Sequence, residues 1–237
     1  MHFRLTNGRA TALYYIGFMG LILGLIASNP TWLWLTLGVH LVVVSVFSAV
    51  IHRYFCHRAY EAHPTLMWLL SFLPVAYGYS SPIGWTSLHS AHHAFSDTER
   101  DTHIKGWIGL FTAAYRMPPM KFALQARWFH NKRHQTLIDY GMVVVLVWHC
   151  LLALISVDAL IWAGLVPMFT LHFCNGMHRV FSHSGTTVMN RWYLEYLFPM
   201  GGEWIHDEHH VNARKPIFRN RWYELDTGAL VVKALAR

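Results

Sequence analysis

The sequence contains few charged residues. Asp, Glu, Lys and Arg together make up 13% of its 237 residues, whereas a water-soluble domain carries about 25%. Hydrophobic residues account for 54%, and aromatic residues are abundant, with 11 Trp, 11 Tyr and 14 Phe. This composition argues against an ordinary soluble domain and is typical of a protein that meets lipid, where aromatic residues gather at the membrane interfaces.

Cysteine is scarce as well. The three cysteines, Cys56, Cys150 and Cys174, are scattered along the chain, and this excludes a fold built on a framework of disulfides. A reducing, cytoplasm-facing setting is the simpler expectation. A small-residue cleavage pattern is missing after the first apolar run, so we expect that run to be retained as a membrane segment.

Four long apolar runs predict four transmembrane helices, at about 12–28, 31–51, 140–156 and 158–175. Each is long enough to cross a hydrocarbon core of about 30 Å, the first only just. Asn29-Pro30 and the segment around Asp158 supply the turns of two hairpins. The run from Leu66 to Tyr79 is shorter and contains Pro74, which favours a buried or re-entrant helix over a span.

The basic residues give an independent test of this topology. All 19 Lys and Arg residues lie outside the two hairpin turns, so four spans place every one of them on a single face, and the positive-inside rule makes that face cytoplasmic. We therefore predict an all-α integral membrane protein with one domain over residues 1–237. Its cytoplasmic helical cap would comprise 52–139 and 176–237, with both termini and the site on that side.

Three histidine clusters lie beside the apolar runs. They read His52-Arg-Tyr-Phe-Cys-His57, His89-Ser-Ala-His92-His93 and His206-Asp-Glu-His209-His210. Positions i, i+3 and i+4 share one face of an α-helix, while adjacent residues splay apart. The two His-x-x-His-His clusters can therefore serve two different ions. His52 and His57, five residues apart, fit two separate ions or a helix that ends between them.

The type and number of ligands limit which metals and reactions are expected. Imidazole suits zinc, copper, iron and nickel, but a zinc hydrolase needs about three ligands and an open position for each ion. Eight histidines in three clusters exceed that number. A histidine-rich pair of redox metals beneath an apolar pocket favours oxygen chemistry on an apolar substrate.

At these residues the chain resembles the membrane-bound fatty acid desaturases, most closely the acyl-CoA Δ9 desaturase-like branch. That family has a His-x4-His box followed by two His-x2-His-His boxes, in the order found here. The flanking residues are similar too: His-Arg opens the first box, Ser96-Asp-Thr-x-x-Asp101-x-His103 follows the second, and Gly202-Glu203 precedes the third. The resemblance extends from about Tyr15 to Asn212, nearly the whole chain.

The resemblance implies a four-helix membrane stem, a cytoplasmic cap, and two irons that use O2 as co-substrate. It also implies a ninth histidine after the fourth span, which His178 matches, and an Asn four residues earlier. Here that position is Cys174, with Asn175 displaced by one, so Asn175 stays a candidate and His183, five residues after His178, could compensate. The implied metal-binding and catalytic residues are His52, His57, His89, His92, His93, His178, His206, His209 and His210.

The expected activity follows from the same resemblance. A fatty acyl desaturase removes two hydrogens from neighbouring methylenes and leaves a cis double bond, with a Δ9-like position suspected. Asp101 and Glu203 are candidates to orient imidazole N–H groups. Trp85 and Trp204, with Tyr77, Tyr79 and Trp107, are candidates to line an acyl tunnel, though membrane-proximal aromatics also serve as anchors.

The partners are less defined. Relatives acting on acyl-CoA have an Arg-Asp pair before the second box, where this chain has Ser87-Leu88, so acyl-CoA, an acyl-lipid and an acyl carrier protein all stay open. The net charge of +7 suits anionic membrane lipid and an acidic electron donor such as ferredoxin or a cytochrome b5-like protein. No nucleic-acid partner is expected.

Two alternative functions stay open. A di-iron membrane hydroxylase of the same superfamily would begin with the same hydrogen abstraction and finish by oxygen rebound. A non-catalytic membrane protein that binds metal or haem would also be rich in histidine, and a haem protein would show a strong Soret band.

Overall fold

The computed structural model describes residues 6–104, 106–119, 121–122, 128–183 and 188–237, and over these ranges it is helical, with two isolated bridges in place of any strand. Three helices are long and apolar enough to cross a membrane: Asn7–Ala27, Leu33–Cys56 and Val157–Phe181. A fourth candidate is a bent pair, Lys132–Asp139 and Gly141–Ile155, whose axes differ by 67°. Within the described ranges, three helices could therefore cross a membrane, or four if the bent pair forms one span.

Helices lie at all four predicted spans, although the third is long enough to cross a membrane only together with α8 (Lys132–Asp139). Helix α1 (Asn7–Ala27) begins five residues before the predicted start of the first span. The second span consists of α2 (Leu33–Val46) and η2 (Phe47–Cys56). Helix α9 (Gly141–Ile155) covers the third, and α10 (Val157–Ala159), η3 (Leu160–Leu165) and α11 (Val166–Phe181) form the fourth. Multi-pass membrane architecture is therefore confirmed at the level of helix length and composition.

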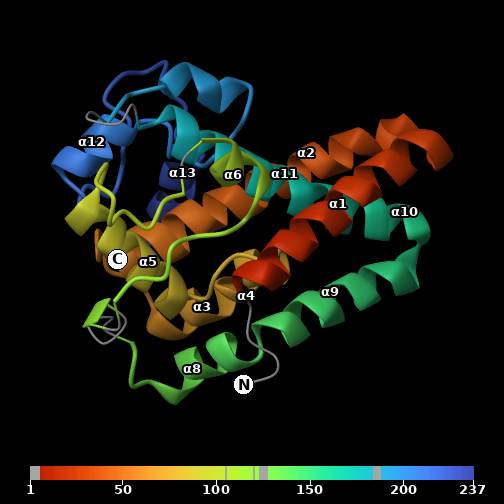
Figure 1. Ribbon diagram of the computed structural model, residues 1–237, viewed down its shortest axis with the longest axis horizontal. Coiled ribbons are helices and arrows are strands. Elements are labelled where there is room, and N and C mark those ends of the chain that lie inside the picture. Colours follow the sequence, from red (N-terminus) through yellow and green to blue (C-terminus); the bar gives the residue numbers. More distant parts are fainter. Residues whose placement is uncertain (1–5, 105, 120, 123–127, 184–187) are drawn as a thin grey trace.

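Glycines allow α1 to approach the fourth span closely at the end of η3, in the stem, which extends to the right in Figure 1. A Cβ atom on Gly17 would lie 2.6 Å from the Leu165 carbonyl oxygen, and one on Gly20 would lie 2.6 Å from the Leu165 Cβ. Small residues at such crossings let helix backbones pack against each other within a bilayer.

Helix η2 is wound as a π-helix over its ten residues, Phe47–Cys56. The hydrogen bond from the His57 N–H to the His52 carbonyl, 3.1 Å, spans five residues, as π winding requires. π-Helical turns are rare and concentrate at functional sites. This winding lies at the end of the second span, where the first histidine cluster is found.

The remaining elements form the cap on the left of Figure 1. They are α3 (Pro64–Leu70), α4 (Phe72–Ala76), α5 (Pro82–Phe95), α6 (Gly106–Phe111), α8 (Lys132–Asp139), η4 (Trp192–Tyr196), α12 (His206–Val211) and α13 (Thr227–Leu235), whereas η1 (Pro30–Trp32) lies in the turn between α1 and α2 at the far end of the stem. The short apolar helix expected near Leu66 is present as Pro64–Ala76. Residues 120 and 123–127 of the cap lie outside the described residues.

Two buried arginines at the ends of spans bind the cap to the stem. Arg53, on η2, pairs with Asp226 through Nη2–Oδ1 at 2.7 Å and Nη1–Oδ2 at 3.1 Å. Arg179, on α11, donates to the carbonyls of Gly109, Thr112 and Ala114. Both side chains are essentially inaccessible to solvent, so these contacts fix the cap loops over the histidines.

Candidate metal centre

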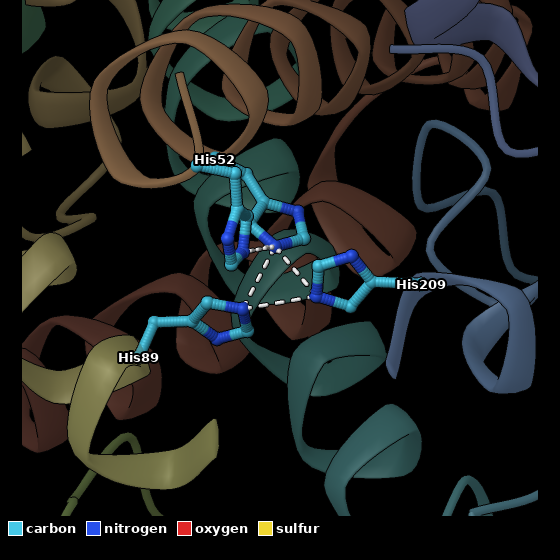
Figure 2. Close-up of side chains that lie close together, drawn as sticks. His52, His89 and His209 are labelled. Atoms are coloured by element: carbon cyan, nitrogen blue, oxygen red, sulfur yellow. Dashed lines mark hydrogen bonds between the residues drawn. The ribbon is translucent and has the colours of Figure 1, made fainter. Parts of the chain in front are cut away.

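Five histidines from three parts of the chain converge in a first group: His52, His57, His89, His93 and His209. The His52 Nε2 lies 2.8 Å from the His89 Nε2, 3.0 Å from the His57 Nε2 and 3.2 Å from the His209 Nε2. The His93 Nε2 lies 2.9 Å from that of His89 and 2.8 Å from that of His209. Figure 2 shows the rings of His52, His89 and His209 turned toward one another.

Four histidines form a second group: His92, His183, His206 and His210. The His206 Nε2 lies 2.9 Å from the His183 Nε2 and 3.1 Å from the His210 Nε2. The His92 Nε2 lies 3.3 Å from the His210 Nε2. Each His-x-x-His-His cluster is thereby divided between the two groups, as its helical spacing predicted.

These nitrogen–nitrogen distances fit a shared metal ion. Neutral imidazole carries one N–H, so five converging Nε2 atoms cannot all be satisfied by hydrogen bonds to one another. Metal–imidazole bonds of about 2.0–2.1 Å place neighbouring ligand nitrogens about 3 Å apart at right angles. The observed spacing of 2.8–3.3 Å is what such ligands require, and the buried groups suit a metal at each place.

The helices that carry the histidines determine where each imidazole lies. Helix α5 begins at Ser81, whose side chain accepts the Gly84 N–H, and carries its histidines in the last two turns. Helix α12 consists almost wholly of its histidine cluster. The π winding of η2 brings His57 beside His52, because its i→i+5 hydrogen bond stacks these two residues. The sequence left two arrangements open for this pair: two separate ions, or a helix that ends between the two histidines. In the structure η2 ends at Cys56, between His52 and His57.

Carboxylates hold the rear nitrogens of several rings. The His52 Nδ1 lies 2.7 Å from the Glu203 Oε2, and the His92 Nδ1 lies 2.8 Å from the Asp101 Oδ1. Asp101 and Glu203 were the two candidates for this role from the sequence, which did not indicate their partners. The structure adds Asp97, whose Oδ2 lies 3.1 Å from the His183 Nδ1. Such carboxylate–histidine pairs fix the ring tautomer and leave Nε2 free to bind a metal.

Burial keeps the ligand rings neutral. Loss of hydration, followed by repulsion from neighbouring imidazoles, lowers the pKa of His93 to about 3 and that of His210 to about 2. The same two causes lower the pKa values of His57, His89 and His209 well below the ordinary value. Neutral imidazole is the form that coordinates metals.

His178 and Asn175 take different places from those in the two groups. The His178 Nε2 lies 3.0 Å from the Glu203 carbonyl oxygen, to which it donates. Its ring centroid lies 4.4 Å from that of His206. The Asn175 amide donates to the Tyr115 hydroxyl at 2.8 Å. Tyr115 had no sequence signal, since no histidine motif includes it.

An apolar cavity of about 670 Å³ lies beside the two groups, within the range of small-molecule sites. A smaller cavity of about 20 Å³, room for about one water molecule, touches His89, His178 and His206. Trp85 and Asn175 line both cavities. Trp85 therefore forms a wall between the large cavity and the histidines, with its ring stacked on that of His89 at 5.7 Å.

The other tunnel candidates are divided by the structure. Tyr79 lines the large cavity. Trp204 is fully buried, donates its N–H to the Phe198 carbonyl and packs its ring 5.3 Å from that of His178. Tyr77 donates to the Ala163 carbonyl, and Trp107 is 76% exposed. Among the described residues, neither cavity is lined by Trp204, Tyr77 or Trp107.

Comparisons with known proteins give relatives of low identity over most of the chain. A hex-5-enoyl-[acyl-carrier protein] acetylenase from Moorena producens (strain JHB) is 24% identical, and the match covers 80% of this chain and 69% of the relative. Delta-9 desaturase-like 1 protein from Arabidopsis thaliana is 25% identical, covering 94% and 79%. An acyl-CoA 5-desaturase from Anemone leveillei is 23% identical, covering 95% and 77%. No family model matches the chain.

Proposed function

We propose that this chain, a member of the membrane fatty acid desaturase family, is an O2-dependent fatty acyl desaturase. It would remove two hydrogens from adjacent methylenes of an acyl chain and leave a cis double bond, while O2 is reduced to two waters with two further electrons from a separate donor. The observation that carries this proposal is the apolar cavity that ends at Trp85, directly beside two buried groups of histidines.

Two irons are the proposed metals. The first group would hold one through its five imidazoles, and His92, His206 and His210 would hold the other, with one further ligand considered below. When bound, the irons supply oxygen activation and hydrogen abstraction. The protein supplies the arrangement: Glu203 and Asp101 each hold the Nδ1 of a ligand ring, so that the opposite nitrogen faces the metal.

The chain's aromatic residues would hold the substrate and exclude water. The Trp85 ring packs edge-on against Phe47 at 4.9 Å, and Phe47 stacks on Tyr79 at 4.4 Å. These rings form a continuous wall from His89 into the large cavity. An acyl chain lying along this wall would be desolvated and held at a fixed depth, which positions one pair of methylenes for reaction.

The finer assignments are part of the same proposal. The resemblance favours a Δ9-like position, although the relatives include a 5-desaturase and an acetylenase by name. Acyl-CoA, an acyl-lipid or an acyl carrier protein would present the chain. The basic residues would face the cytoplasm, together with both termini and the site, and would attract an acidic ferredoxin or cytochrome b5-like donor.

Expression in a host of known lipid content tests the proposal. With a competent donor co-expressed, mass spectrometry with double-bond location should reveal a new unsaturated acyl species. That species should disappear in His92→Ala and persist in His63→Ala, a matched change at an exposed histidine outside both groups. A hydroxylated chain in its place would identify the hydroxylase alternative, and unchanged lipids with a loaded metal site would refute desaturation.

A further inference from the structure

The first histidine box has a second copy in the chain. His52-Arg-Tyr-Phe-Cys-His57 closes the second span, and His178-Arg-Val-Phe-Ser-His183 closes the fourth. Both copies share the pattern His-Arg-x-Phe-x-His. The arginine of each copy is buried and donates to backbone carbonyls of the cap. The repetition therefore extends from sequence to structural role.

The two copies have matching surroundings. The ring of His52 lies 4.4 Å from that of His89 with an interplanar angle of 87°, and the ring of His178 lies 4.4 Å from that of His206, also at 87°. The last histidines agree as well: His57 to His89 is 4.9 Å at 79°, and His183 to His206 is 4.8 Å at 81°. The two copies thus place their last histidines alike, so that His183 corresponds to His57.

The two copies differ in the contacts of their first histidine. The His52 Nε2 enters the first group, 2.8 Å from the His89 Nε2. The His178 Nε2 instead donates to the Glu203 carbonyl. The backbones differ at the same place, because the His57 N–H bonds the His52 carbonyl five residues back, whereas the Ser182 N–H bonds the His178 carbonyl four residues back.

We propose that His183, and not His178, is the fourth imidazole ligand of the second metal. The His183 Nε2 lies 2.9 Å from the His206 Nε2, and its Nδ1 lies 3.1 Å from the Asp97 carboxylate. The side chain is 4% exposed. Asp97 has a backbone φ of +63°, a conformation that is uncommon outside glycine. Asp97 thus stands to His183 as Glu203 stands to His52.

His178 is then a positioning residue. Its N–H holds the Glu203 backbone, while the Glu203 carboxylate holds the Nδ1 of His52. The first group has five imidazoles and the second has four. The small cavity touches His89 of the first group and His206 of the second, as well as His178. Only the link from this site to an acyl substrate rests on the proposed function. The assignment of His183 as a metal ligand does not.

Metal content of purified protein tests the assignment. The full chain and its variants are purified in detergent from cells supplied with iron, and iron per chain is measured by mass spectrometry together with Mössbauer spectra. We expect two irons in the unaltered chain, one in His183→Ala and two in His178→Phe. The matched change His57→Ala should lose the spectral component that His183→Ala retains. His63→Ala, at an exposed residue, should keep two irons and an unchanged spectrum.

Asp97→Asn separates ligation from folding, because it leaves His183 in place. It should keep two irons, shift the spectrum of the second iron alone, and leave the first unchanged. Two irons with an unchanged spectrum in His183→Ala would overturn the assignment, as would loss of one iron in His178→Phe. Both readouts are independent of turnover, so a correctly loaded protein that forms no unsaturated product would refute the proposed function and leave this assignment standing.

Discussion

Replacing Asp226 by Asn should strongly destabilise the fold. Arg53 and Asp226 form a pair whose side chains both have 0% exposure. Arg53 also donates to the carbonyls of Gly201 and Pro216, and its guanidinium lies 3.8 Å from the centre of the Phe218 ring. Phe218 in turn packs against His209, with ring centroids 5.0 Å apart. The ion pair therefore supports the loop that covers the first histidine group.

The magnitude follows from leaving a buried charge unpaired. Breaking a buried ion pair by removing one partner costs about 3–5 kcal/mol. Asp226 accepts the Phe218 and Ala229 N–H groups on separate oxygens, at 2.8 and 2.9 Å. Asn has a single acceptor oxygen and can keep only one of these two bonds, so we expect at least the lower end of that range. A loss of about 3 kcal/mol corresponds to roughly a hundredfold change in the unfolding equilibrium.

Denaturant titration in mild detergent, followed by tryptophan fluorescence, measures this free energy of unfolding. Glu208→Gln is the matched control, because the Glu208–Lys215 pair has side chains 37% and 25% exposed at 3.2 Å. Exposed pairs contribute about 0–1 kcal/mol. If both variants lost the same small amount, backbone carbonyls alone would be sufficient for Arg53, and the reasoning would be wrong.

Three further predictions concern the cavity, the histidines and the stem. Trp85→Ala should join the two cavities and broaden the distribution of double-bond positions, measured by mass spectrometry of lipids. A single unchanged double-bond position would contradict the role of Trp85 as the wall between the large cavity and the histidines. Since burial holds the pKa of His93 at about 3 and of His210 at about 2, against about 6.5 when unfolded, the metal-free protein should be fully stable above about pH 6.5. Its unfolding free energy should fall as pH drops from there toward 3, by about 1.4 kcal/mol per group per pH unit. A flat profile of unfolding free energy against pH would contradict this prediction. Gly17→Leu should destabilise by about 2 kcal/mol, because the added Cβ meets backbone, whereas Gly38→Leu, with nothing within 4 Å, should be neutral.

The spans were predictable because each depends on local composition. Apolar runs long enough to cross a bilayer are legible without tertiary information, and α1 and α9 follow them closely. The apolar runs did not predict the bend between α8 and α9. Helix α8 is polar, so no hydropathy pattern extends it from the third span. Its 67° angle to α9 accompanies contacts with α5, a helix that lies far away in the sequence.

The two histidine groups were predictable in part. The i, i+3, i+4 spacing correctly divided His92 from His93, because those two residues lie on one helix with known geometry. The cavity could not be derived, because its wall combines Val75, Tyr115 and His172 from three separate segments. Asp97 is one of several acidic residues near the histidine boxes, and the sequence does not distinguish it from Asp207. Its contact with His183 singles it out only in the structure.

The two copies of the box show why spacing alone cannot assign a ligand. On an α-helix, residues five apart point about 140° away from each other, whereas on a π-helix they differ by only about 50°. The π winding of η2 therefore brings the His52 and His57 rings into one group. Helix α11 stays α-helical through Phe181, so His178 turns toward the Glu203 carbonyl while His183 reaches the second group. One sequence pattern thus places two rings in a histidine group in one copy and one ring in the other, and the difference lies in how the preceding helix is wound.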